Sequence, residues 1–91
     1  MPSRAGYEEA LEWADRALHE QPHFSPAFRI KVVSLVQLDR LEEACHWLQR
    51  LRELQPGLTI AWYQTYGARF LPPEILTVMV DGFRKAGLPE E

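Results

Sequence analysis

A segment that occurs twice, 34 residues apart, limits the folds open to this 91-residue chain. The stretch EEALEWADRALHEQP at residues 8–22 returns as EEACHWLQRLRELQP at residues 42–56, with seven of the fifteen paired positions identical. A repeat of this length is one supersecondary unit, and such a unit leaves an apolar face that it cannot bury alone. The repeat therefore predicts a fold in which like units stack and cover one another.

Both copies of the repeated segment have the apolar spacing of a helix. Apolar residues recur every three or four positions through residues 7–20 and again through residues 41–54, which places them on one face of a helix. Pro22 and Pro56 follow the two segments, and the residue before a proline is disfavoured in the α region. We therefore predict helices over 7–20 and 41–54.

Residues 26–38 are the one ambiguous segment. Apolar and basic residues alternate from Phe28 to Val32, which is typical of a strand. However, no second strand-like run is present to pair with it, and an apolar stretch of about eleven residues is long for a strand. A helix that is held on two sides is also apolar nearly all round. We therefore predict a helix, with Ser25 as its N-cap and Pro26 at its first position.

Cap and stop signals define the other helix ends. Asp39, with Glu42 three residues later, resembles a capping box, and Thr59 is expected to cap a shorter fourth helix. The last helix is expected to start within residues 72–74 and to stop at Gly87, because glycine readily adopts the left-handed conformation that ends helices. The prediction is an all-α chain of five helices joined by short turns.

At these residues the sequence resembles the tetratricopeptide repeat (TPR) family, in which a 34-residue period is built from two helices. The residues that carry the resemblance are Ala10, Ala14, Ala17 and Pro22, then Ala44, Leu48, Leu51 and Pro56, with Ala27-Phe28 and Ala61-Trp62 where first helices begin. The resemblance implies a right-handed α–α superhelix, or solenoid, of antiparallel helix hairpins. Within a single domain of residues 1–91, it implies a half repeat at 7–22, a full repeat at 25–58, and a degenerate repeat with a C-terminal cap at 59–88.

Stacking of this kind needs small residues that let helices approach and large residues that fill the gaps between them. Trp13 and Trp47 occupy equivalent positions, so we expect each to pack one hairpin onto the next. Lys31 stands where the family usually has leucine, so its helix pair is expected to sit differently. The expected packing residues are Ala10, Trp13, Ala14, Ala17, Phe28, Ala44, Trp47, Leu48, Leu51 and Trp62.

The end of the chain is similar to a second kind of protein. Pro56-Gly57-Leu58 and the stretch GFRKAGLPE at residues 82–90 look like the C-terminal tail of some bacterial signalling proteins. In those proteins, repeat arrays follow a nucleotide-cyclase domain or a winged-helix regulator domain. The resemblance implies that this chain is a fragment of a larger bacterial signalling protein. It carries no catalytic residue over, since the metal-binding aspartates of the cyclase have no counterpart here.

The TPR resemblance also implies a binding groove on the concave face of the solenoid. The residues at the groove positions are Arg29, Val33, Val36, Gln37, Ile60 and Tyr63. The expected function is that of a protein-interaction module, which binds a peptide or a helix of a partner in this groove. The alternative is a structural segment with no peptide ligand, which caps a longer array or forms a homodimer through the uncovered helix at 7–20. Neither function is enzymatic.

Composition argues against several other classes of protein. The net charge is −3 and the basic residues are spread along the chain, so we expect no nucleic-acid partner, and no apolar run approaches a membrane span. The single cysteine, Cys45, fits a reducing compartment such as the cytoplasm. His46 beside it points about 100° away on a helix, which does not suit a catalytic pair. His19, His23 and His46 lack the further ligands of a metal site, so we expect neither a metal nor a cofactor.

Overall fold

The computed structural model describes residues 4–91, and the part of the predicted domain at residues 1–3 lies outside it. These residues form five helices with no strand among them, which confirms the all-α prediction. Every predicted helix is present, with bounds within a few residues of those expected. The helices are α1 (Arg4–Glu20), α2 (Ser25–Gln37), α3 (Leu41–Leu54), α4 (Ile60–Phe70) and α5 (Pro73–Ala86).

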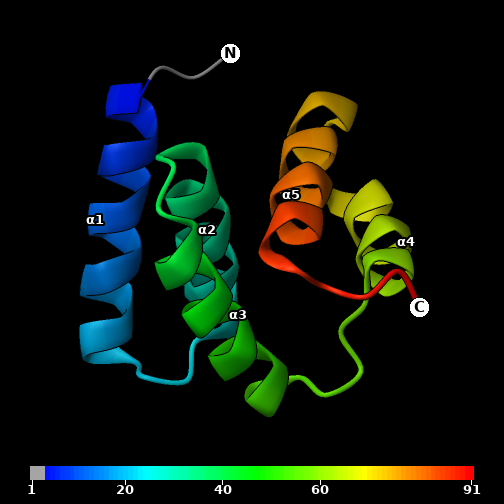
Figure 1. The fold of residues 1–91 in the computed structure, drawn as a ribbon, viewed down its shortest axis with the longest axis horizontal. Helices are drawn as coiled ribbons and strands as arrows, with labels where there is room; N and C mark the ends of the chain where they lie inside the picture. The colour runs from blue at the N-terminus through cyan, green and yellow to red at the C-terminus, as the bar shows by residue number, and fades with distance from the viewer. Residues whose placement is uncertain (1–3) are drawn as a thin grey trace.

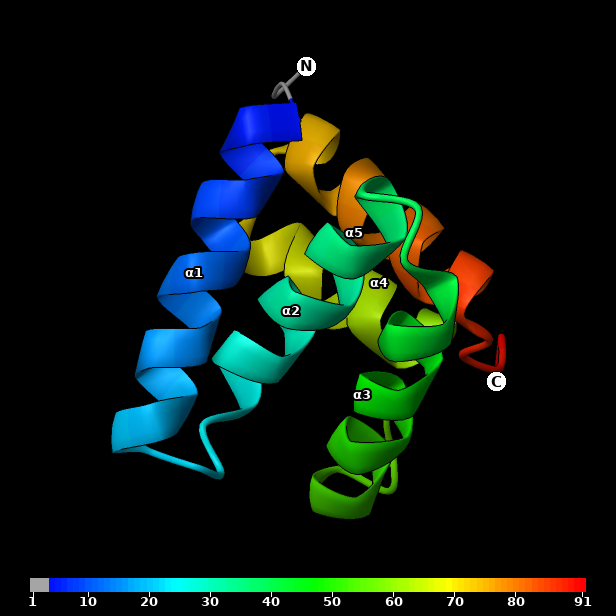
Figure 2. The same ribbon diagram turned by 60° about the vertical axis from the view of Figure 1, so that its left-hand side comes forward.

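Helix α2 lies at the centre of the molecule. It packs against α1, α3 and α5, while α5 also packs against α3 and α4. Figure 1 shows α1 on one side of α2 and α3, and the α4–α5 pair on the other. In the rotated view of Figure 2, α2 lies in front of the α4–α5 pair, with α1 to its left.

The central position of α2 explains why its sequence has no polar face. Phe28, Val32, Val33, Leu35 and Val36 are all buried, because three helices cover α2 from different sides. Such a helix is apolar nearly all round and loses the periodicity of an amphipathic helix. The strand-like alternation in this segment therefore reflects burial on several sides.

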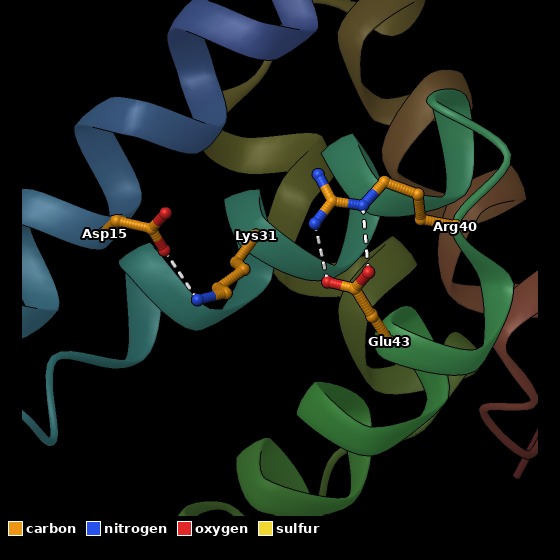
Figure 3. A network of polar contacts seen from close by, with 4 residues as sticks. All are labelled: Asp15, Lys31, Arg40 and Glu43. Atoms are coloured by element: carbon orange, nitrogen blue, oxygen red, sulfur yellow. Dashed lines mark hydrogen bonds and ion pairs between the residues drawn. The ribbon is translucent and has the colours of Figure 1, made fainter.

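Two of the predicted helix caps are wrong. Helix α2 begins at Ser25 itself, and the residue before it, Phe24, makes no side-chain cap. Asp39 has a φ of 59°, in the left-handed region, so it ends the turn after α2, and Arg40 becomes the cap residue of α3. The Arg40 guanidinium forms a bidentate ion pair with Glu43, at 2.7 Å and 3.0 Å, as Figure 3 shows. An acidic residue in the first turn still complements the helix dipole.

The predicted end signals of α4 and α5 are confirmed. The Thr59 hydroxyl accepts a hydrogen bond of 3.1 Å from the backbone N–H of Trp62. Gly87 has a φ of 103°, and the N–H of Leu88 donates to the carbonyl of Phe83 at 3.0 Å. This left-handed glycine with a return hydrogen bond and a buried apolar residue after it is a Schellman motif.

The second half of the chain packs in an order that the repeat did not predict. The Ala27-Phe28 pair of α2 is buried, whereas the matching pair of α4, Ala61-Trp62, is exposed. The reason is that α5, rather than α4, packs on α2, with Gly82 against Val33. A Cβ added at Gly82 would lie 3.1 Å from both methyl groups of Val33.

One core joins all five helices. Its fully or nearly fully buried members include Leu11, Phe28, Val32, Leu35, Leu38, Ala44, Leu48, Leu51, Leu58, Ile60, Tyr63, Val80, Phe83, Ala86 and Leu88. Phe83 of α5 contacts Tyr63 of α4 edge to face, with ring centroids 5.0 Å apart. The α4–α5 pair is thus joined to the rest of the molecule through α5, and the free side of α4 borders the site described next.

Candidate functional site

An apolar cleft lies between the first half of α2, the helix α4 and the start of α5. Its volume is about 220 Å³. Arg29 is the one charged residue in its lining. The lining residues are Pro26, Arg29, Ile30, Tyr63, Tyr66, Phe70, Leu71, Ile75 and Met79.

A second apolar depression, of about 140 Å³, adjoins this cleft. The two share Ile30, Ile75 and Met79, so they form one continuous surface. The second depression extends the surface to α1, and its further lining residues are Tyr7, Ala10, Val33, Ser34 and Val78. We call the cleft and this depression together the apolar trough. The trough runs across four of the five helices, with α2 between its two sides.

The aromatic residues of α4 form one edge of the trough. Trp62, Tyr66 and Phe70 are spaced four residues apart, so they lie along one side of the helix. Trp62 and Tyr66 stack with centroids 5.0 Å apart, and Tyr66 and Phe70 lie 5.2 Å apart. Phe70 is 69% exposed and Tyr66 37% exposed.

One further apolar side chain faces solvent beside this aromatic edge. Ile75, at the start of α5, is 46% exposed, while Met79 one turn later is buried at the base of the cleft. Helix α4 packs closely against α5 and against no other helix, which leaves its aromatic side uncovered. Contiguous exposed apolar surface of this kind is typical of a binding site.

Arg29 provides the charge of the trough. Its guanidinium carbon lies 5.3 Å from the centroid of the Tyr66 ring and 6.0 Å from that of Tyr63. These are cation–π distances. The Nε atom of Arg29 is buried and has no hydrogen-bond partner. No carboxylate of residues 4–91 lies within ion-pair distance of it. The trough therefore holds a positive charge that has no carboxylate partner among the described residues.

Tyr63 forms a rigid wall beside Arg29. Its side chain is buried against Phe83, and this burial raises the pKa of Tyr63, while the neighbouring Arg29 opposes the shift. The phenol therefore stays neutral well above physiological pH. It supports Arg29 and offers no reactive group.

The predicted groove residues are only partly brought together. Arg29 and Tyr63 line the cleft, and Val33 borders the second depression. Val36 and Ile60 are buried in the core, and Gln37 is half-buried outside the trough. The six residues do not line one groove, because Val36 and Ile60 are buried in the core.

Most lining residues of the trough are not among the predicted groove residues. Tyr66, Phe70, Ile75 and Met79 lie in the degenerate region, where the repeat no longer indicates which positions face inward. The signal that was available is the spacing of Trp62, Tyr66 and Phe70, which predicts three aromatic rings on one side of a short helix.

Most of the predicted packing residues are at least half-buried. Trp47 is half-buried between Phe28, whose ring centroid lies 5.7 Å away, and the ammonium group of Lys31 at 3.9 Å. Trp13 and Trp62 differ, with exposures of 45% and 39%, so the expectation that they pack between hairpins is corrected. Trp13 lies on α1, which packs against α2 alone among the helices of residues 4–91. The residues of this set that are at least half-buried are Ala10, Ala14, Ala17, Phe28, Ala44, Trp47, Leu48 and Leu51.

The cysteine and histidines lie apart from the trough. The Cys45 thiol donates a hydrogen bond of 3.3 Å to the carbonyl of Ala86 and so links α3 to the end of α5. His46 contacts the edge of Trp47, with centroids 5.4 Å apart. Residues 4–91 contain no group of three or more metal-binding side chains. In the same part of the chain, no helix combines the length and apolarity needed to cross a bilayer.

No family model, curated protein or solved structure matches this chain.

Proposed function

We propose that this chain is a protein-interaction module that binds a peptide or a helix of a partner protein in the apolar trough. The observation that carries the proposal is the trough itself, an apolar surface across four helices with exposed Tyr66, Phe70 and Ile75 beside a single cation. Covering such side chains is favourable by about 25 cal/mol per Å² of apolar surface. Monomeric proteins rarely leave contiguous patches of this kind without a use.

The size of the trough favours a peptide over a small molecule. Small-molecule pockets usually enclose about 300–1,000 Å³, whereas the two parts of the trough measure about 220 Å³ and 140 Å³. Each part matches the volume of one or two side chains rather than that of a whole ligand. A helix or extended segment laid across the surface would place one side chain in each depression.

The proposal extends to the architecture and its setting. The 34-residue period and the packing of α2 against both α1 and α3 support a TPR-like solenoid, with α4–α5 as its divergent last unit. The resemblance of the chain end supports a place in a larger bacterial signalling protein. The single cysteine supports a cytoplasmic setting. No catalytic role is part of this proposal.

A selection experiment tests the proposed site. Peptides are selected from a displayed random library on the folded chain, then synthesised and titrated by fluorescence anisotropy. Phe70→Ser and Ile75→Ser should each weaken binding by about tenfold or more, because each removes apolar contact area. Trp13→Ser is the matched control, since Trp13 is similarly exposed but lies outside the trough. Equal loss in all three variants, or none in the trough variants, would overturn the proposal.

Self-association is the second candidate function, and the exposure of Trp13 on α1 favours it. The other exposed side chains of α1 are mainly acidic, including Glu8, Glu9, Glu12 and Asp15. Like charges would oppose the pairing of two copies of this surface, so the candidate ranks second. Light scattering after size-exclusion chromatography tests it, because a dimer through α1 should dissociate in Trp13→Glu and persist in Phe70→Ser.

A further inference from the structure

Two of the basic residues in this chain stand apart from the others. Of the ten lysines and arginines, Arg29 and Lys31 are the two that are not exposed, and both lie on α2. Lys31 has a partner, because its ammonium group lies 2.5 Å from a carboxylate oxygen of Asp15. Arg29 has none among the carboxylates of residues 4–91. A partly buried cation normally has a counter-charge, since burial without one is costly.

The position of Arg29 is fixed by its surroundings. Tyr63 and Tyr66 hold the guanidinium at 6.0 Å and 5.3 Å from their ring centroids, and Tyr63 is itself locked in the core. The guanidinium lines the same cleft as Ile75 and Met79. A ligand that places a carboxylate at Arg29 therefore has an apolar depression directly beside it.

We infer that the segment bound in the trough carries a side-chain carboxylate, from Asp or Glu, that pairs with Arg29. An aliphatic or aromatic neighbour of that residue enters the cleft beside Ile75 and Met79. Arginine pairs with carboxylates through two parallel hydrogen bonds, which fixes orientation as well as adding affinity. This inference rests on the proposed function and specifies the chemistry of the partner.

The occupant is a segment of a partner protein rather than a second copy of this chain. The single guanidinium of Arg29 can pair with one side-chain carboxylate. The cleft lining has no second cation that could bind the C-terminal carboxylate of a partner. Exposed acidic residues of this chain also have apolar neighbours, as Glu12 has Trp13, so the dimer measurement decides whether a second copy competes for the cleft. The partner segment is thus an acidic, apolar peptide.

A charge swap tests the inference. The tightest-binding peptide from the library selection is synthesised with its acidic residue kept, changed to Gln, or changed to Lys. Arg29→Glu and the milder Arg29→Gln should each lower the affinity of the chain for the acidic peptide by about tenfold or more. Arg29→Glu should bind the Lys peptide better than the unmodified chain does. Arg52→Glu makes the same charge change on an exposed arginine of α3 and should leave binding within about twofold.

The outcomes separate this inference from the proposed function. If selected peptides lack acidic residues, or if Arg29→Gln binds them unchanged while Phe70→Ser does not, the inference is overturned and the trough remains a binding site. If Phe70→Ser has no effect, the proposed function fails with it. A concentration-dependent dimer that Phe70→Ser abolishes would show that a second copy occupies the trough, which also overturns the inference. Circular dichroism of each variant confirms that the chain is folded.

Discussion

Lys31 shows how a single charged residue can hold three helices together. Its side chain is 14% exposed and reaches from α2 to Asp15 of α1, as Figure 3 shows. The same ammonium group lies 3.9 Å from the ring centroid of Trp47 on α3. The stem of a lysine packs like an apolar chain while its charge finds a partner. The charge of Lys31, on the central helix α2, is therefore accommodated by one carboxylate and one indole ring.

The loss of that carboxylate should destabilise the fold. Asp15→Asn leaves the partly buried Lys31 without its counter-charge, so we expect unfolding free energy to fall by about 1 kcal/mol, a moderate value because Asp15 is half exposed. Urea unfolding followed by circular dichroism measures the change. Asp39→Asn is the control, since Asp39 is 92% exposed and lies 3.9 Å from Arg4. Equal losses of unfolding free energy in the two variants would show that the Asp15–Lys31 pair stabilises the fold no more than an exposed ion pair does.

At the scale of elements, α4 depends on the end of the chain. The N–H groups of Ile60 and Ala61 donate to the carbonyls of Pro89 and Glu90, each at 2.9 Å. The first N–H groups of a helix have no partner within the helix. The residues after α5 supply two such partners, and the Thr59 hydroxyl supplies a third. The red end of the chain beside α4 in Figure 1 marks this contact.

Removal of residues 89–91 should therefore loosen the start of α4. We expect faster hydrogen exchange at the amides of Ile60 and Ala61, because their carbonyl partners are lost, with little change in α1. Thr59→Ala should act on the same helix and cost about 1 kcal/mol. Exchange rates measured by NMR provide the readout. Unchanged protection at Ile60 and Ala61 in the shortened chain would contradict this role of the chain end.

The contact at the chain end should also depend on pH. Arg84 forms a bidentate ion pair with Glu90, at 2.8 Å and 3.0 Å, and this lowers the pKa of Glu90 below its usual 4.5. A lowered folded-state pKa means that the stabilisation is present above the ordinary pKa and is lost as pH falls through the lowered value. The Ile60 and Ala61 amide resonances should therefore shift as acid is added.

Glu90→Gln should largely remove that pH response, while Glu91→Gln should preserve it. The measurement is a titration by NMR from neutral to acidic pH. If the Glu90→Gln chain responds to acid as the unmodified chain does, another group controls the contact.

The helices of this chain can be predicted from its sequence, whereas two of the helix caps and part of the site cannot. Periodicity and stop signals predict five helices, because the apolar stripe, Pro22 and Gly87 act locally. The caps at Ser25 and Asp39 were wrong, since either residue can equally well be part of the helix or end the preceding turn. Of the trough, Arg29, Val33 and Tyr63 are among the groove positions that the TPR resemblance implies. Phe70 and Ile75 were not predicted as site residues. The periodicity of a helix identifies its apolar face, but it does not identify the helix against which that face packs.

At the scale of the whole molecule, the approach of α5 to α2 determines the shape. The radius of gyration is 12.1 Å, close to the roughly 12 Å expected for a compact domain of this length. Gly82 lets the two helices meet closely at Val33. This contact places α5 on the centre of the molecule and α4 on the outside, which opens the cleft between α2 and α4.

A larger residue at Gly82 should disturb this arrangement. Gly82→Val forces a branched side chain against Val33, so we expect a loss of about 1–3 kcal/mol in unfolding free energy. The double change Gly82→Val with Val33→Ala should lose at least about 0.5 kcal/mol less than the sum of the single changes, because it relieves the overlap. Gly57→Ala is the control, since nothing lies within 4 Å of a Cβ there. Strict additivity would contradict the close contact.

The central claim is that the apolar trough is the binding surface of this molecule. Its most direct test is the amide spectrum of the chain, recorded by NMR while a selected acidic, apolar peptide is added. We predict that the largest shifts fall at Arg29, Tyr66, Phe70 and Ile75, with little change around Trp13. Shifts confined to α1 or α3, with the resonances of α4 unmoved, would contradict the claim.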